Sequence, residues 1–170
     1  MLKFYQEIKN NTGLLSKIVV MIYRFGNFIV YKVRIPLVKQ ALYVVYRFLD
    51  LIFLKFLLND DIPAKFKAGS GFKIYHPYGI FINDAVEVGE NFICRGQVTL
   101  GNKGNLYENG CPQLGNNISV GVGAKIIGEL RLEDGCRIGA NAVVTKSFKR
   151  GSILIGIPAR NISKDGDHSL

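Results

Sequence analysis

The sequence contains no tryptophan, two histidines, three cysteines and five prolines in 170 residues. The cysteines, Cys94, Cys111 and Cys136, are odd in number and have no CxxC or other metal-ligand spacing, so neither a disulfide scaffold nor a metal site is predicted. The length excludes two full-sized domains. The first residues also lack the compact apolar run and small-residue cleavage site of a signal peptide, and the cysteine content fits a reducing cytoplasm.

Basic residues outnumber acidic ones, and the excess is concentrated at the N-terminal end. The net charge is +9, and residues 1–58 contain nine Lys or Arg but only two acids, Glu7 and Asp50. The basic residues are interspersed with eleven of the nineteen Phe and Tyr residues. This mixture is typical of a surface that meets anionic lipid and is more apolar than a nucleic-acid patch, so we predict no nucleic-acid partner.

Two apolar stretches, residues 18–31 and 35–58, contain charged residues such as Arg24 and Lys39 that are costly at a bilayer centre. Neither stretch therefore predicts a spanning helix. The second predicts an amphipathic helix with a wide apolar face and one polar stripe at alternating three- and four-residue steps: Gln40, Tyr43, Arg47, Asp50 and Leu54. We expect the apolar face to pack within an oligomer or to contact the inner face of the cytoplasmic membrane.

The chain changes character near Asn59, and from Ala68 onward aliphatic residues recur every six positions. The register shifts by two residues after Ile80 and is interrupted by an insertion at 102–113. A six-residue unit with one inward aliphatic and small or Asn turn residues makes one short strand and one corner, and three units close a triangular coil. We predict a helical region over 1–58, a parallel β-helix over 59–163 and a polar tail over 164–170.

Five segments resemble the hexapeptide-repeat acyltransferases, and specifically their serine acetyltransferase-like branch: HPYGI at 76–80, GCPQLG at 110–115, VGVGAKIIG at 120–128, IGANAVVTK at 138–146 and GIPAR at 156–160. The resemblance implies a left-handed β-helix, although parallel crossovers are right-handed by default. It also implies transfer of an acetyl group from acetyl-CoA to a hydroxyl.

A hydroxyl is a weak nucleophile at neutral pH and needs a base, for which histidine has a suitable pKa. The chain's other histidine, His168, lies in the polar tail, so His76 is the candidate base. In the family an aspartate stands fifteen residues before the catalytic histidine, and Asp61 has that spacing; its carboxylate would orient the imidazole. A cap at the helix junction is the alternative role for Asp61, and the adjacent Asp60 leaves the assignment open.

The resemblance places a CoA site along a seam of the β-helix. Backbone groups around Gly121, Val122 and Ala140 would meet the pantetheine, and Arg137 would lie near the nucleotide end. Arg160 would bind a CoA phosphate or cap the last coil.

The resemblance also implies a homotrimer, in which the insertion of one subunit forms one side of the active site of its neighbour. Its amide and aromatic side chains would then lie on the acceptor side: Asn102, Asn105, Tyr107 and Asn109.

Departures from the family decide the predicted acceptor. Serine acetyltransferases have an Arg-His pair where this chain has Gly110 and Cys111, and an aspartate where it has Tyr75. Free serine carries two charges that need partners, whereas an uncharged sugar beside Tyr75, Tyr78 and Cys111 does not. We therefore predict an O-acetyltransferase of a capsule or O-antigen polysaccharide or its precursor, with a serine O-acetyltransferase or a non-catalytic trimeric scaffold as alternatives.

Overall fold

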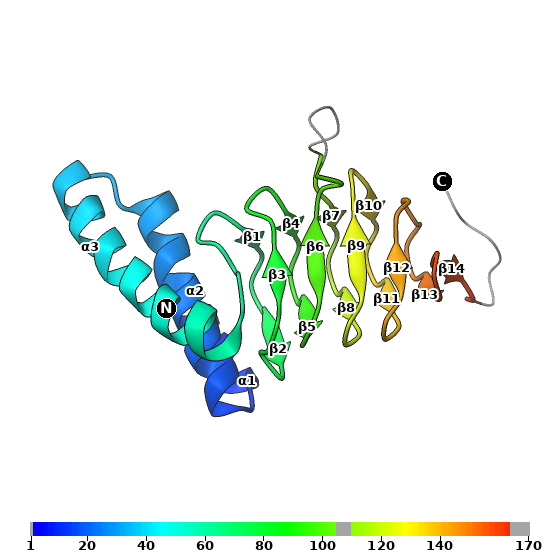
Figure 1. Ribbon diagram of the computed structural model, residues 1–170, viewed down its shortest axis with the longest axis horizontal. Coiled ribbons are helices and arrows are strands. Elements are labelled where there is room, and N and C mark those ends of the chain that lie inside the picture. Colours follow the sequence, from blue (N-terminus) through cyan, green and yellow to red (C-terminus); the bar gives the residue numbers. More distant parts are fainter. Residues whose placement is uncertain (1, 105–109, 164–170) are drawn as a thin grey trace.

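The computed structural model describes residues 2–104 and 110–163, and it places a helical N-terminal region at one end of a row of short strands (Figure 1). The helical elements are α1 (Leu2–Asn10), α2 (Leu14–Lys32), α3 (Pro36–Leu49) and the π-helical η1 (Asp50–Leu57). The strands are β1 (Lys67–Ala68), β2 (Lys73–Tyr75), β3 (Phe81–Ile82), β4 (Glu87–Val88), β5 (Ile93–Arg95), β6 (Thr99–Gly101), β7 (Gln113–Leu114), β8 (Ser119–Val120), β9 (Lys125–Ile127), β10 (Arg131–Leu132), β11 (Arg137–Ile138), β12 (Val143–Val144), β13 (Ile153–Ile155) and β14 (Arg160–Asn161).

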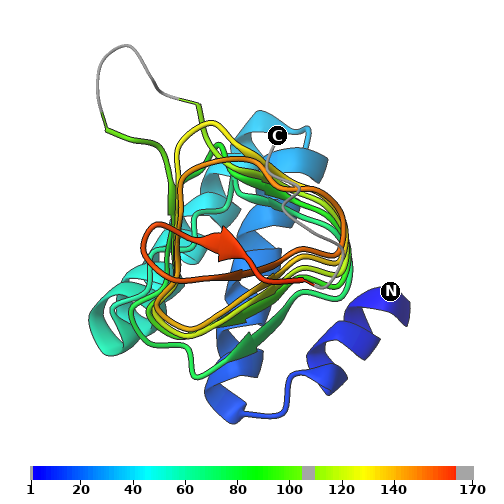
Figure 2. The ribbon, with the colours of Figure 1, turned by 90° about the vertical axis from the view of Figure 1, so that its right-hand side faces the viewer.

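The strands form three sheets, which are the three sides of a triangular coil seen along its axis in Figure 2. The first sheet has the order β1-β4-β7-β10, the second β2-β5-β8-β11-β13-β14 and the third β3-β6-β9-β12. All pairings are parallel except that of β13 with β14. The predicted fold, a parallel β-helix preceded by helices, is confirmed.

The six-residue register accounts for the core. Ile74 pairs with Cys94, and Leu100 pairs with Ile126, so equivalent residues of successive coils stack in columns. These side chains are buried. The two-residue shift after Ile80 does not break the column, because two extra residues lengthen one corner and the next strand then resumes the register.

Close backbone approach explains the small residues at the corners. A Cβ on Gly69 would lie 2.7 Å from the Glu90 nitrogen of the next coil, so only glycine fits there without moving a coil. Asn91 and Asn117 turn neighbouring corners with φ of 56° and 57°, and the Asn91 side-chain amide donates to Asn117 Oδ1 at 3.0 Å. Asparagine tolerates this left-handed conformation and adds a hydrogen bond between coils.

Helix α2 covers the open end of the first coil. Tyr23 Oη donates to the Phe66 carbonyl at 2.9 Å, and Arg24 donates to the carbonyls of Ala68 and Gly69 at 2.8 and 2.6 Å. By length and composition α2 would be long and apolar enough to cross a membrane. Because these contacts tie it to the first coil, we interpret α2 as a core helix.

The predicted helix over 35–58 forms as α3 and η1, with its apolar face outward. Tyr46, Asp50 and Leu54 are buried, so part of the predicted polar stripe faces the protein. Gly26 of α2 makes this orientation possible, because a Cβ there would lie 2.3 Å from a carbon of the Tyr46 ring.

Candidate active site

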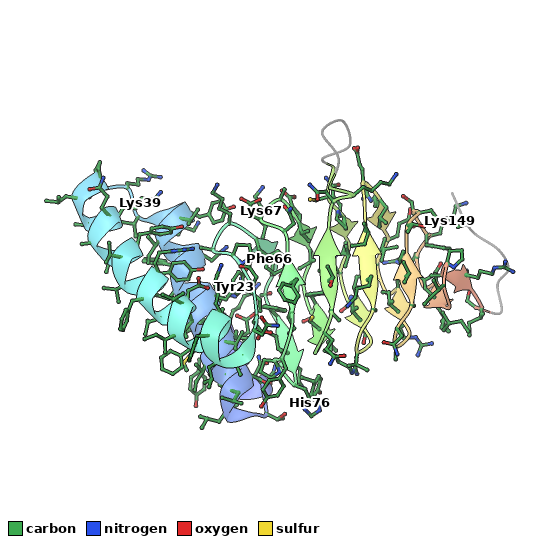
Figure 3. The ribbon with its side chains drawn as sticks, in the orientation of Figure 1. Tyr23, Lys39, Phe66, Lys67, His76 and Lys149 are labelled. Carbon is green, nitrogen blue, oxygen red and sulfur yellow. The ribbon has the colours of Figure 1, made fainter. Side chains whose placement is uncertain are left out.

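His76 lies at the corner that follows β2, with its side chain at the edge of the first coil (Figure 3). Its φ is 54°, a left-handed conformation that is uncommon for residues other than glycine. The Tyr78 N–H donates to the His76 carbonyl at 2.8 Å and closes the turn. The residue is exposed, and within residues 2–104 and 110–163 no hydrogen bond or ion pair holds its imidazole. The ring is therefore available to a substrate.

Asp60 and Asp61 dock against the same turn. The Asp61 N–H donates to the Ile80 carbonyl at 2.7 Å, and the Ile82 N–H donates to the Asp61 carbonyl at 2.9 Å. The Asp61 carboxylate is half-buried and pairs with Lys55 Nζ at 3.1 Å. The predicted pair His76 and Asp61 thus shares one corner, but the carboxylate is held by the lysine.

Asp60 has a different environment from its neighbour. It is 1% exposed, and its Oδ1 accepts a hydrogen bond from the Ile80 N–H at 2.7 Å. Burial raises the pKa of this carboxyl to about 7, although the Ile80 hydrogen bond opposes the rise. Asp60 therefore has a structural role, because its carboxylate holds the backbone of the turn that leads into β3. The predicted role of Asp61 at the imidazole stays a prediction.

The residues predicted to bind CoA lie in later coils, at corners equivalent to that of His76. A Cβ on Gly121 would lie 2.6 Å from the Ala140 nitrogen, so the two corners are in direct backbone contact. Val122 is exposed beside them, and its carbonyl accepts from the Asn141 N–H at 2.9 Å. This seam is lined by backbone groups, as the binding of an amide-containing arm such as pantetheine requires.

The two predicted phosphate-binding arginines are exposed at the far end of the second sheet. Arg137 lies on β11, paired with Ser119 and Ile153, and Arg160 lies on β14, paired with Ile155. Both are on the sheet that leads to the His76 corner.

Cys111 lies on another side of the coil. It lines a hollow of about 350 Å³ between the third and first sheets, together with Gly110, Glu129 and Arg131. Within one subunit this corner is distinct from that of His76. Burial raises the pKa of the Cys111 thiol, which disfavours a nucleophilic thiolate.

Some predicted features fall outside the described residues. These are Asn105, Tyr107 and Asn109 of the insertion, and the tail with His168.

Two cations beside Tyr75, the residue before the candidate base, were missed from the sequence. Lys73 Nζ lies 4.7 Å from the centre of the Tyr75 ring, and the Arg95 guanidinium carbon lies 5.5 Å from it. Arg95 is half-buried and donates to Ser119 Oγ at 3.2 Å and to the Val120 carbonyl at 3.3 Å. The six-residue register could have revealed Arg95, because it pairs Arg95 with Tyr75 of the neighbouring coil.

A larger hollow than that at Cys111 also lies away from the His76 corner. It measures about 550 Å³, lies over the first sheet and is lined by Glu87, Arg131 and Asp134 among others. The predicted catalytic corner with His76 is exposed to solvent in the single subunit.

Comparison with known proteins identifies relatives. No family model matches the chain. It is 36% identical over 135 residues to the serine acetyltransferase of Helicobacter pylori strain J99, which covers 79% of this chain and 78% of the relative. The chain belongs to the serine acetyltransferase family.

Solved structures of the family agree with this assignment. Serine acetyltransferase from Brucella abortus strain S19 in complex with coenzyme A matches with a TM-score of 0.75 and 25% identity, over 91% of this chain and 58% of that one. The soybean enzyme complexed with serine matches with a TM-score of 0.69 and 25% identity, over 86% and 56%. This chain thus spans a little over half the length of those two solved chains.

Family membership confirms several predictions and overturns one. The left-handed β-helix and an acetyl-CoA-dependent acyltransferase are confirmed. The prediction of a polysaccharide O-acetyltransferase is wrong, because the relatives are serine acetyltransferases. It rested on missing charges at Tyr75, Gly110 and Cys111, whereas in the structure two other charged residues, Lys73 and Arg95, flank Tyr75.

Proposed function

We propose that this protein is a serine O-acetyltransferase, which transfers the acetyl group of acetyl-CoA to the side-chain hydroxyl of serine. The observation that carries the proposal is the similarity to the Helicobacter enzyme over most of both chains. His76 and Asp61 at the family spacing, on one solvent-facing corner, support it.

His76 acts as the general base in this proposal. Its imidazole removes the proton from the serine hydroxyl as the oxygen attacks the thioester carbonyl carbon. The carbon–sulfur bond of the tetrahedral intermediate then breaks, and the imidazolium returns the proton to the CoA sulfur. Serine becomes O-acetylserine, and free CoA leaves.

Asp61 is a positioning residue for that base. A carboxylate near the second imidazole nitrogen fixes the tautomer and stabilises the imidazolium that forms during the reaction. In the structure Lys55 neutralises Asp61. We infer that this ion pair loosens when substrate and a facing subunit complete the corner.

The CoA donor is proposed to follow the seam along the coil axis. Gly121, Val122 and Ala140 present backbone groups to the pantetheine, and Arg137 and Arg160 offer positive charge to the phosphates. This arrangement delivers the thioester toward the His76 corner.

Serine recognition in this protein needs anchors other than the Arg-His pair of the family. Arg95 and Lys73 flank Tyr75 next to His76, so we propose that they attract the serine carboxylate. Tyr78, which is exposed two residues after His76, would pack against the bound amino acid. Positive charge here does not favour the serine ammonium, so we expect a higher KM than in relatives that have the acidic anchor.

A homotrimer is part of the proposal. The His76 corner is open in one subunit, and the corner with Cys111 lies elsewhere on the coil. In a three-fold assembly, the Cys111 corner of one subunit can face the His76 corner of the next.

The test is an acetyl-transfer assay of the purified chain with acetyl-CoA, following both CoA release and the acetylated product by mass spectrometry. We expect L-serine to be acetylated, and serine methyl ester, which lacks the carboxylate, to react with a lower kcat/KM. Arg95→Ala should remove most of that difference. CoA release no faster with serine than with water would contradict the proposal, and a trimer that fails to bind acetyl-CoA in calorimetry would favour a scaffold.

A further inference from the structure

Exposed apolar side chains gather on α3 and η1, and α3 lies at the end of the molecule away from the strands (Figure 1). We call this surface the α3 face. It contains Leu37, Val44, Phe48, Leu51 and Phe56, which are 78%, 69%, 63%, 57% and 89% exposed. Exposed apolar side chains in contiguous groups mark interaction surfaces, whereas scattered single ones do not.

The α3 face is not a core surface left open by chance. The opposite side of the same helix already packs on the protein, with Tyr46 against Gly26 and with Asp50 buried. Lys39 also points inward, and its Nζ donates to the Val30 carbonyl at 2.9 Å. Because Tyr46, Asp50 and Lys39 are on the side that packs within the fold, the apolar side of the helix is the one presented outward.

Charge around the α3 face is complementary to an anionic partner. Residues 1–58 contain nine basic residues and two acidic ones. Both acids are buried and paired within the fold, Glu7 with Arg24 at 2.7 Å and Asp50 with Arg47 at 3.8 Å. In the described part of this region no acidic side chain therefore faces solvent, whereas Lys32 and Arg34 are exposed next to α3, so the solvent-facing charge of this region is positive.

We propose that the α3 face docks on an anionic lipid bilayer, with α3 and η1 lying in the plane of the interface. An interfacial helix buries its apolar side at the headgroup boundary and holds cations beside anionic headgroups. Lys32 and Arg34, both exposed at the junction between α2 and α3, are placed for those headgroup contacts. Tyr43 of α3 is also exposed, and tyrosine favours the membrane–water boundary.

Docking in this way would place the bilayer at the helical end of the molecule. Helix α2 lies between α3 and the first coil, and His76 is at the edge of that coil (Figure 3). The η1 end of the α3 face is the part nearest the active-site corner, because Lys55 of η1 pairs with Asp61. The proposal does not depend on which acceptor the enzyme uses.

The experiment measures cosedimentation of the full chain with vesicles. One set is equal parts of phosphatidylcholine and phosphatidylglycerol, and the other is phosphatidylcholine alone. We expect binding to the anionic set and weaker binding at high salt. A triple variant, Val44→Ser, Phe48→Ser and Phe56→Ser, should bind roughly tenfold or more weakly, because it removes apolar surface from the contact.

Control variants separate the apolar contribution to vesicle binding from the contribution of charge. Ile162→Ser, an exposed apolar residue at the other end of the molecule, should bind vesicles like the wild type. Lys32→Glu with Arg34→Glu should remove the preference for phosphatidylglycerol. Circular dichroism and acetyl transfer in the absence of vesicles show that the variants are folded.

Three results would overturn the proposal. The first is no vesicle binding by the wild type, and the second is equal binding by the wild type and the triple variant. The third is a fall in the solution mass of the triple variant with no change in vesicle binding, which would make the α3 face an interface between copies.

Discussion

At the scale of single residues, the corner after β2 concentrates the chemistry. His76 turns the chain in a left-handed conformation, and this places its imidazole outside the coil. A non-glycine residue in this region of φ carries strain, and such strain is found where a side chain must be aimed. The neighbouring acids are divided between structure and function by burial, since Asp60 is inside and Asp61 is half-buried.

The first prediction concerns the order of effects at this corner. His76→Ala should lower kcat by roughly 100-fold or more, the scale for loss of a general base, with acetyl-CoA binding retained. Asp61→Asn should lower kcat less, because the imidazole remains but is poorly oriented. Cys111→Ala should leave turnover nearly unchanged. Steady-state kinetics and calorimetry check the order, and an inactive Cys111→Ala beside an active His76→Ala would reverse the assignment.

The second prediction concerns the pH dependence of stability. The pKa of Asp60 is raised by burial to about 7 in the folded protein, above its usual value near 4 in an unfolded chain. The folded state therefore binds the extra proton, so the stabilisation is complete below the unfolded pKa and is lost as pH rises through about 7. Asp60→Asn should remove a slope of up to about 1.4 kcal/mol per pH unit in this window.

Urea unfolding of the wild type and Asp60→Asn at a series of pH values makes the measurement. A smaller slope of the same sign should remain in the variant, because burial also raises the pKa of Asp50. Identical pH profiles for the two proteins would show that Asp60 is ionised in the fold.

At the scale of elements, each strand has only two or three residues, and stability comes from stacking rather than from strand length. The corners fix the distance between coils. Where a glycine corner touches the next coil, a single methyl group has no space.

A matched pair of substitutions tests this element-scale argument. In Gly69→Ala the new Cβ would lie 2.7 Å from the Glu90 nitrogen, whereas in Gly101→Ala it would lie 3.9 Å from the Asn83 Cβ, an ordinary contact. We expect Gly69→Ala to lower the free energy of unfolding by about 1–3 kcal/mol and Gly101→Ala to change it by less. Denaturant unfolding of both variants measures the difference, and equal losses would refute the role of coil contact.

At the scale of the whole molecule, an exposed base and an insertion on another corner imply sites shared between subunits. We expect a homotrimer of the 18.9 kDa chain in sedimentation equilibrium. A fully active monomer would contradict this expectation.

Mixed trimers give a sharper test of the shared site. Cys111→Arg should obstruct the surface that one subunit contributes to the shared site. His76→Ala removes the base that the neighbouring subunit contributes. Each variant alone should be nearly inactive. Coexpression should restore part of the turnover, because some sites then combine an intact base with an intact wall, and no recovery would place both residues in the same subunit's site.

The β-helix could be predicted from the sequence more completely than the active site could. The columns through Ile74, Cys94 and Leu100 followed from the period of six, because each unit makes its own strand and corner. The candidate base followed by elimination from two histidines. The acceptor did not follow, because missing charges exclude particular contacts but do not identify a ligand.

By itself the sequence determined the β-helix and its register, since these depend on patterns within a few residues, and the assignment of His76 as the base stays a prediction. Only the tertiary structure decided which of Asp60 and Asp61 is buried, and that Lys73 and Arg95 flank Tyr75. It also decided that α3 turns its apolar side outward, because Gly26 leaves room for Tyr46 on α2. An amphipathic pattern defines two faces of a helix, but contact with a neighbouring element selects the face that is buried.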